Sequence, residues 1–254
     1  NKYRVLFILH LPPPVHGAAM MGKYIHDSRI INENIEGEYI NLTLAKDMQD
    51  IGKSGIRKLR DYIILLLHIR NEVKRFKPEL CYVTPNAKGR AFYKDFVVVQ
   101  MLKAMGQKVV VHYHNKGVVT RQDKFLDNFL YKRFFKNLKI ILLAEQLYSD
   151  IKKYVDKENV YFCPNGIPKQ KEAPIIKEHD EFNILFLSNM MEAKGVWNLV
   201  DACKILNDKG RKFKCHFVGK WSDITEVEFM KKIHEYGLDN TCLLYTSPSP
   251  RDCS

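Results

Sequence analysis

The apolar positions of this chain follow two patterns that alternate along most of its length. Short continuous apolar runs, rich in β-branched residues, are typical of parallel strands buried on both faces of a sheet. They occupy residues 4–9, 37–42, 80–84, 108–114, 139–143, 159–163, 182–187 and 214–218. Between them, apolar residues recur every three or four positions, which indicates amphipathic helices. These segments are residues 18–28, 55–77, 90–105, 123–135, 144–154, 196–208 and 225–236. Such alternation predicts an α/β protein with parallel sheets.

The longest predicted helix, residues 55–77, combines apolar and basic side chains. Its apolar stripe consists of Leu59, Ile63, Leu66, Leu67, Val73 and Phe76. Lysines and arginines take much of the remaining surface. A stripe of this kind usually packs against the core, and a helix that lies on a membrane surface is the alternative. We expect this stripe to be buried in the core.

A polar stretch divides the chain into two predicted domains. Residues 169–181 contain one proline and few apolar residues, so they predict a linker. Residues 1–168 hold six of the predicted strands, enough for a complete N-terminal Rossmann-like domain. Residues 182–240 hold only two, and they predict a partial second domain that exposes a strand edge and apolar surface.

The end of the sequence is expected to be foreign to the protein. Residues 242–252, CLLYTSPSPRD, match the translation of one reading frame of a common transposase sequencing adapter. We therefore expect residues 241–254 to be a non-native tail packed on nothing, and the chain to be a truncated fragment. With its second domain incomplete, this chain is expected not to catalyse a reaction by itself.

The segment 182–198 has the layout of an anion site. A buried strand leads through a short polar loop with Ser188 and Asn189 to Lys194 and Gly195, where a helical pattern begins. The free N–H groups and the dipole of a helix N-terminus attract anions, and a lysine adds a full positive charge. The spacing predicts a phosphate site at this turn.

Polar residues also follow strands of the first predicted domain. The loop after the first strand contains three prolines, then His16 and Gly17 at a helix start. His114 ends the strand 108–114, and His112 shares its face because side chains alternate along a strand. Ligands bind at the carboxyl ends of parallel strands, although a core histidine is the common alternative. No third ligand lies near the two histidines in sequence, so we predict no metal site.

Two motifs together resemble the family 4 glycosyltransferases. They are VYFCPNGIP at residues 160–168 and FNILFLSNMMEAKGVWN at residues 182–198, and the resemblance extends to about residue 240. In that family an Asn-Gly-hydrophobic turn closes the first domain, and the second opens with a strand, a short turn and a Lys-Gly pair. The resemblance implies the GT-B fold, in which two Rossmann-like domains face each other across a cleft.

The resemblance also implies an activity and a set of site residues. Family members move a sugar from a nucleotide-diphosphate donor to a glycan or lipid-linked acceptor, usually with retention of configuration and without a metal or cofactor. It implies donor binding by Ser188, Asn189, Lys194, Gly195 and Gly219. It further implies a catalytic or sugar-lining role for His114 and a crevice loop at His16 and Gly17.

One residue departs from the pattern of that family. Asn189 occupies the position where family members commonly have arginine, and a neutral amide cannot give the bidentate charge-assisted bonds to phosphate that arginine gives. Donor binding is therefore expected to depend more on Lys194. The paired glutamates of the family would lie beyond residue 240.

The composition limits the kinds of partner that the protein is expected to bind. With 41 Lys and Arg against 29 Asp and Glu, the formal charge is +12, which favours anionic partners such as nucleotide sugars or an anionic membrane surface. Nucleic acid is disfavoured, because the basic residues are spread over many helices. The six cysteines form no C-x-x-C pair, which predicts reduced thiols and a cytoplasmic protein, with the inner membrane face as a second expectation.

Two other functions stay open at this point. The sequence has no G-x-G-x-x-G, G-x-S-x-G or Asp-x-Asp motif, so nicotinamide chemistry, α/β-hydrolase chemistry and the metal site of the other main glycosyltransferase fold are disfavoured. The alternatives are a non-catalytic α/β module that binds a phosphorylated ligand, and a nucleotide-sugar epimerase on the same fold.

Overall fold

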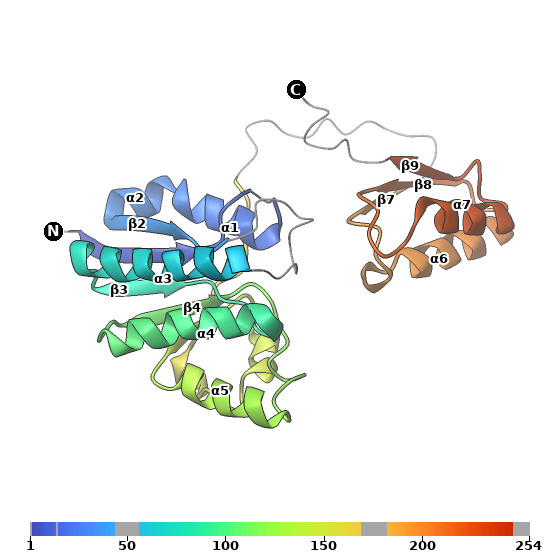
Figure 1. The fold of residues 1–254 in the computed structure, drawn as a ribbon. Helices are drawn as coiled ribbons and strands as arrows, with labels where there is room; N and C mark the ends of the chain where they lie inside the picture. Colours follow the sequence, from blue (N-terminus) through green and yellow to red (C-terminus); the bar gives the residue numbers. More distant parts are fainter. Residues whose placement is uncertain (1, 14, 44–55, 169–181, 246–254) are drawn as a thin grey trace. The chain divides into compact units, whose positions relative to one another are not determined.

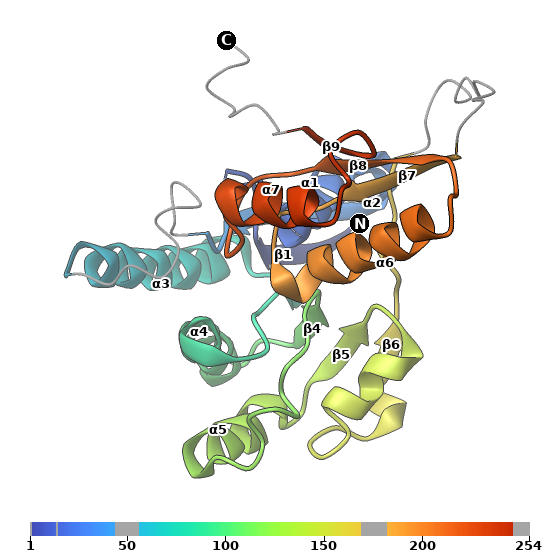
Figure 2. The same ribbon diagram turned by 90° about the vertical axis from the view of Figure 1, so that its right-hand side faces the viewer.

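The chain forms two compact units, Asn1–Gln170 and Lys171–Ser254, each built on a parallel sheet (Figures 1 and 2). The structure is a computed structural model, and it describes residues 2–13, 15–43, 56–168 and 182–245. The predicted linker 169–181 and residues 246–254 lie outside the described residues. Mixed α/β architecture with parallel sheets confirms the predicted fold class.

The sheet of unit 1 reverses its strand order next to the first strand. Its strands are β1 (Tyr3–Leu9), β2 (Ile35–Asn41), β3 (Leu80–Val83), β4 (Val109–Tyr113), β5 (Lys139–Leu142) and β6 (Val160–Phe162). Their spatial order is β2-β1-β3-β4-β5-β6, and all pairs are parallel. The chain therefore moves one way from β1 to β2 and the other way from β3 onward. The switch point lies between β1 and β3, where open α/β sheets bind ligands.

Helices cover both faces of this sheet. They are α1 (Gly17–His26), α2 (Arg29–Asn34), α3 (Ile56–Phe76), α4 (Gly89–Ala104) and α5 (Phe125–Phe135). In β1 the side chains alternate between two cores. Val5, Phe7 and Leu9 pack with residues of α1 and α2, whereas Leu6 and Ile8 join the core beneath α3, α4 and α5. This period of two is what a strand buried on both faces requires.

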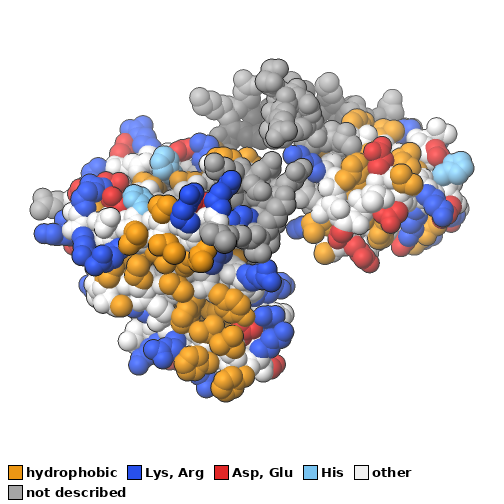
Figure 3. Space-filling view, in the orientation of Figure 1, with side chains coloured by type: hydrophobic (Ala, Val, Ile, Leu, Met, Phe, Trp, Pro, Cys, Tyr) orange, Lys and Arg blue, Asp and Glu red, His pale blue; other side chains and the backbone are white. Residues whose placement is uncertain are grey.

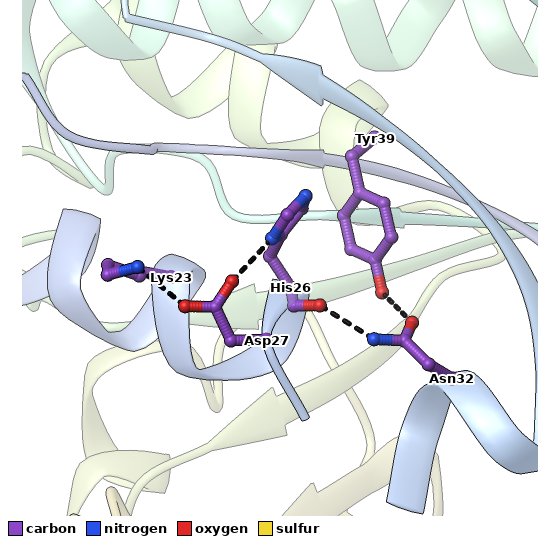
Figure 4. A network of polar contacts seen from close by, with 5 residues as sticks. All are labelled: Lys23, His26, Asp27, Asn32 and Tyr39. Atoms are coloured by element: carbon purple, nitrogen blue, oxygen red, sulfur yellow. Dashed lines mark hydrogen bonds and ion pairs between the residues drawn. The ribbon is translucent and has the colours of Figure 1, made fainter. Parts of the chain in front are cut away.

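A chain of surface contacts joins α1, α2 and β2 (Figure 4). Asp27 accepts bonds from Lys23 at 2.5 Å and from the His26 ring at 2.7 Å. The amide of Asn32 donates to the His26 carbonyl at 2.8 Å, and the Tyr39 hydroxyl donates to Asn32 at 3.1 Å. These contacts lie at the turn between the two helices, so we assign them a structural role.

Several predicted boundaries in unit 1 were wrong. Residues 144–154 form a 3-10 turn, η2 (Glu145–Asp150), and further turns instead of an α-helix. The reason lies in Asp150, whose buried carboxylate accepts the backbone N–H groups of residues 117–119 at 2.8–3.1 Å. The short helix α2 was missed, and it begins at Ser28, whose hydroxyl accepts the N–H of Ile31. Tertiary contacts and caps thus override the apolar pattern.

The orientation of α3 also differs from the prediction. Its buried residues are Leu65, Ile69, Val73 and Phe76. Leu59, Ile63 and Leu67 were expected in the core but are 61, 48 and 51% exposed. Apolar residues occur on both sides of this helix, so periodicity could not decide which side faces the sheet.

The described part of unit 2, residues 182–245, contains three parallel strands and two α-helices. The strands are β7 (Phe182–Leu187), β8 (Phe213–Val218) and β9 (Cys242–Tyr245), in the order β7-β8-β9. Helices α6 (Val196–Asp208) and α7 (Glu226–Glu235) pack on one face, where they share a core with the inner residues of β8. On the strand β7, Leu185 and Leu187 are 63 and 71% exposed. This agrees with the predicted exposed apolar surface.

The strand β9 contradicts the prediction of a tail packed on nothing. It pairs with β8 from Cys215↔Cys242 to Val218↔Tyr245, and Cys242 is buried. The sequence Cys-Leu-Leu-Tyr is apolar, and it pairs with the free edge that β8 would otherwise expose. The structure does not test the foreign origin of these residues. Among the described residues no helix is long and apolar enough to cross a membrane.

Candidate functional site

Three histidines and a lysine come together near the carboxyl edge of the unit 1 sheet. His10 directly follows β1, His16 precedes α1, and His114 directly follows β4. The rings of His10 and His16 are 5.9 Å apart between centroids. His16, Lys94 and His114 all lie close enough to His10 to lower its pKa. Residues from three separate segments and from α4 therefore form one polar cluster.

His10 lies at the topological switch point. Its backbone N–H donates to the Thr84 hydroxyl, just after β3, at 3.4 Å, and its Nδ1 is 3.3 Å from the Thr43 hydroxyl. Burial, more than the neighbouring positive charges, lowers the pKa of His10 to about 4. His10 is therefore neutral at pH 7 and offers a hydrogen bond instead of a charge.

His112 is buried behind this edge. The hydroxyl of Tyr82 is 2.5 Å from its Nδ1, and burial lowers the pKa of His112 to about 4. Burial also raises the pKa of Tyr82, so the hydroxyl stays protonated and donates a hydrogen bond to Nδ1 of His112. The ring proton of the neutral imidazole then resides on Nε2, and a backbone hydrogen bond with Cys163 opposes part of the effect of burial on the pKa.

His114 stacks on His112 with ring centroids 4.3 Å apart. Its Nδ1 is 3.1 Å from Oδ1 of Asn165, which follows β6. An amide oxygen only accepts, so Nδ1 donates and the lone pair of the neutral ring lies on Nε2. That Nε2 is buried without a partner in the described part of the chain. Burial lowers the pKa of His114 as well. A buried unpaired nitrogen costs about 1–3 kcal/mol, so a bound hydroxyl or water is expected there.

The predicted loop residues His16 and Gly17 begin helix α1. Nδ1 of His16 accepts the N–H of Ala19 at 3.3 Å and thereby caps the helix. Gly17 is exposed, and a Cβ placed there would meet no atom within 4 Å. Packing therefore does not demand glycine at this position, and its role toward a ligand stays a prediction.

A buried carboxylate stabilises a loop at the carboxyl edge of the sheet. Asp95 of α4 accepts the backbone N–H of Asn86 at 2.7 Å and its side-chain amide at 2.9 Å. Asn115, two residues after β4, accepts the N–H of Ala87 at 2.8 Å. Burial raises the pKa of Asp95 to about 6, against the opposing effect of the Asn86 bonds. These bonds fix the loops that follow β3 and β4.

In unit 2, the loops after β7 and β8 are in direct contact. The N–H of Ser188 donates to the carbonyl of Val218 at 3.1 Å. A Cβ built on Gly219 would lie 1.8 Å from the carbonyl oxygen of Ser188 and 3.4 Å from Cα of Asn189. Gly219 is therefore required by the packing of these two loops, which holds the predicted donor turn in place.

The helix α6 begins without a side-chain cap. Gly195 is its N-cap residue, with φ 82°, and Lys194 before it is exposed. One nearby N–H, that of Glu192, is already taken by the Asp223 carboxylate at 3.1 Å. The first-turn N–H groups of α6 and the Lys194 ammonium leave a positive end that suits a phosphate.

The structure thus divides the predicted site residues into two groups. His16, Gly17 and His114 belong to unit 1, where His16 and His114 both flank His10; the others belong to unit 2 around the β7–α6 turn. His10, Thr84 and Lys94 were not predicted as site residues. The first two directly follow strands, the same signal that pointed to His114. Lys94 is a helix residue whose proximity to His10 arises only from tertiary packing. Among the described residues no group of three or more His, Cys, Asp or Glu is placed to hold a metal ion.

Comparison with known proteins gives the fold. No family model matches the chain, and no curated protein sequence matches it. Among solved structures, a glycosyltransferase of Rickettsia africae ESF-5 superposes with a TM-score of 0.63 at 16% identity, over 98% of this chain and 69% of its own length. The apo form of WaaB, a lipopolysaccharide outer core galactosyltransferase, gives 0.63 at 12%, over 98% and 70%.

The chain has a GT-B fold. This fold also occurs in a structure described as a UDP-N-acetylglucosamine 2-epimerase of Listeria monocytogenes, with a TM-score of 0.55 at 11% identity, over 100% of this chain and 71% of the other. Identities this low establish the GT-B fold alone, because one fold hosts several reactions. The fold therefore does not determine the activity, which depends on the two groups of site residues.

Proposed function

We propose that the protein is a glycosyltransferase of the family 4 type. It moves a sugar from a nucleotide-diphosphate donor to a hydroxyl of a glycan or lipid-linked acceptor, with retention of configuration and without a metal or cofactor. The observation that carries the proposal is the uncapped start of α6 beside Lys194, directly after the first strand of unit 2. We also propose a cytoplasmic location, which the unpaired thiols among the described cysteines support.

The proposed task of unit 2 is to hold the donor diphosphate. When the glycosidic bond breaks, negative charge grows on the departing diphosphate. The first N–H groups of α6 and the Lys194 ammonium provide positive potential that is fixed before the reaction. Asn189 adds a neutral amide and no charge. Gly219 keeps Ser188 and Asn189 in place through the close packing of the two loops.

The proposed task of unit 1 is to bind hydroxyl groups. His10, His112 and His114 all have lowered pKa values, so they are neutral at pH 7. Neutral imidazoles form hydrogen bonds with sugar hydroxyls without attracting phosphate strongly. The free lone pair of His114 Nε2 accepts a hydroxyl proton in this proposal, which makes His114 an orienting or proton-accepting group. A module that only binds phosphate would favour charged histidines instead.

An epimerase is the second candidate. It also takes a nucleotide sugar, and a structure described as such an enzyme shares the fold. The Asn-Gly-Ile turn at residues 165–167 and the Lys-Gly pair favour the transferase, since they resemble that family. The third candidate, a non-catalytic binder, shares the phosphate site but not the reaction.

Nucleotide binding by this chain tests the donor site. We expect UDP or another nucleoside diphosphate to bind in calorimetric titrations, and Lys194→Ala to weaken binding about tenfold or more, since a hydrogen bond to a charged group is worth about 1.5–3 kcal/mol. Lys209, the C-cap residue at the other end of α6, provides the matched control. Equal affinity in Lys194→Ala and Lys209→Ala would remove the donor assignment.

Product analysis separates the three candidates. With the longest natural form of the chain, a transferase releases nucleoside diphosphate in proportion to the acceptor glycosylated. An epimerase converts one nucleotide sugar into another without an acceptor. A binder does neither, and either of the last two results overturns the proposal.

A further inference from the structure

The segment that follows β6 contacts both histidines at the carboxyl end of β4. Cys163 continues the strand pairing, because its N–H donates to the carbonyl of the last residue of β5 at 2.8 Å. Its backbone also forms a hydrogen bond with His112. Two residues later, Oδ1 of Asn165 is 3.1 Å from Nδ1 of His114. Residues 163–165, called the clamp segment below, therefore hold two imidazole rings.

The backbone of the clamp segment is stiff. The ring of Pro164 fixes its own φ near about −65° and restricts the residue before it to extended backbone. The strand pairing of Cys163 and this proline leave Asn165 a defined position. Asn165 itself is exposed, so packing does not explain an asparagine there. Its bond to His114 does.

The ring of His114 is held from a second side by His112. The two rings stack with centroids 4.3 Å apart and an interplanar angle of 36°. His112 is itself fixed, since it accepts a hydrogen bond from the Tyr82 hydroxyl and bonds to the backbone of Cys163. The stack and the Asn165 bond thus fix the ring of His114 from two elements.

The surroundings of His114 keep it neutral. Burial lowers the pKa of His114, and the bond with Asn165 raises it by less. His112 and His10 lie near it with pKa values of about 4, and Lys94 of α4 lies near His10. Figure 3 shows Lys and Arg side chains spread over the visible face of unit 1, and such a surface opposes a further proton. The neutral ring has one proton, which either of its nitrogens can hold.

We propose that Asn165 is a positioning residue that holds His114 as the Nδ1–H tautomer. Its amide oxygen accepts the bond from Nδ1, so Nε2 keeps its lone pair and accepts a hydrogen bond from a ligand hydroxyl. A carbonyl oxygen has no proton to donate and is disfavoured there. Asn165 thus selects for hydroxyl groups without touching the substrate. The choice of a sugar hydroxyl rests on the proposed function, whereas the tautomer does not.

Nitrogen NMR of the unliganded chain tests the tautomer. The histidines carry a nitrogen-15 label, and the signals of His114 are assigned by their loss in His114→Gln. In the wild type at pH 8 we expect a protonated Nδ1 and an unprotonated Nε2. Asn165→Leu removes the acceptor, so the ratio of the Nδ1–H to the Nε2–H form should fall about threefold to tenfold, the equivalent of one hydrogen bond.

Asn165→Asp keeps the acceptor and adds a charge. The neutral ring should stay in the Nδ1–H form, and the pKa of His114 should rise by about 1 unit or more, because a carboxylate favours the imidazolium. Asn159→Asp is the matched control. It adds the same charge at the opposite end of β6, more than about 10 Å away, and should shift this pKa by less than about 0.3 units in 0.1 M salt.

Three results would each overturn the proposal. They are a wild-type His114 protonated on Nε2, which requires a reversed Asn165 amide, an unchanged tautomer ratio in Asn165→Leu, and an equal pKa rise in Asn165→Asp and Asn159→Asp. Circular dichroism follows the fold of each variant, and the wild type and Asn165→Asp decide the matter if Asn165→Leu does not fold. No substrate enters these measurements, so a failure of sugar transfer would count against the proposed function alone.

Discussion

Asp95 is expected to make the stability of unit 1 fall as the pH rises. It is 6% exposed, and its pKa rises from 3.8 to about 6 because burial disfavours the charged form. The folded state therefore holds its proton more tightly than the unfolded state. This contribution to stability is fully present below pH 3.8 and is lost as the pH rises through about 6.

The substitution Asp95→Asn measures this effect. Asparagine imitates the protonated carboxyl, since its amide oxygen still accepts both bonds from Asn86. At pH 8 the variant avoids burying a charged carboxylate. This raises its free energy of unfolding by about 3 kcal/mol, because the pKa of Asp95 is about 2 units higher in the folded than in the unfolded state. At pH 5 most folded molecules already hold the proton, so the gain drops to about 1.6 kcal/mol. The variant is expected to be more stable than the wild type at both pH values. The difference between their free energies of unfolding grows by about 1.4 kcal/mol from pH 5 to pH 8.

Urea unfolding at pH 5 and pH 8 provides the assay. Both tryptophans, Trp197 and Trp221, belong to unit 2, so their fluorescence reports that unit alone. Unit 1 is followed by far-UV circular dichroism, with hydrogen exchange of the α4 amides as a local readout. Asp123→Asn, which removes an exposed carboxylate from the same unit, is the control.

Destabilisation of unit 1 by Asp95→Asn at pH 8 would contradict a raised pKa of Asp95. An equal stability difference from the wild type at both pH values would do so as well, because Asp95 would then not titrate between them. A change in the tryptophan signal of unit 2 would show that the two units do not unfold separately and that the margin needs the hydrogen-exchange readout.

Two further substitutions test the site from each unit. His10 has a folded pKa of about 4, below its usual value, so its contribution is lost as the pH falls from 6.5 toward 4. His10→Gln should remove up to ~3 kcal/mol of this acid sensitivity in urea unfolding, and an unchanged acid profile would count against it. Gly219→Ala places a Cβ 1.8 Å from the carbonyl of Ser188 and should destabilise unit 2 by ~2 kcal/mol in tryptophan-detected unfolding. Ser222→Ala, at an exposed position three residues further along in the same unit, should change stability little, and equal effects would refute the packing argument.

The strands were predictable because burial on both faces forces continuous apolar runs. Each of the eight predicted runs contains or overlaps a strand, from β1 to β8. β9 was rejected on account of its sequence origin, although Cys242–Tyr245 is as apolar as the others. Its pairing depends on the open edge of β8, which is a tertiary property. The apolar pattern therefore identified the first eight strands. The ninth, β9, forms because β8 offers an unpaired edge.

Some features of the helices and of the site depend on tertiary contacts and could not be predicted from the sequence. Residues 144–154 have a helical pattern, but Asp150 is committed to three N–H groups of a distant loop. The positions of His114, Lys194 and Gly219 after strands or before a helix were visible in sequence. The neutrality of the histidines was not, because it comes from burial. The contact between Gly219 and Ser188 likewise depends on how two neighbouring strands pack.

The imidazoles of the unit 1 site are neutral, and this neutrality has a chemical consequence. The chain carries a formal +12, yet His10, His112 and His114 are kept neutral by burial. A site that had to hold phosphate at this edge would gain from protonated imidazoles, and burial removes that option. Fixed positive potential exists instead at the start of α6 in unit 2. The two units thus offer different chemical environments, a neutral hydrogen-bonding one in unit 1 and a positive one in unit 2.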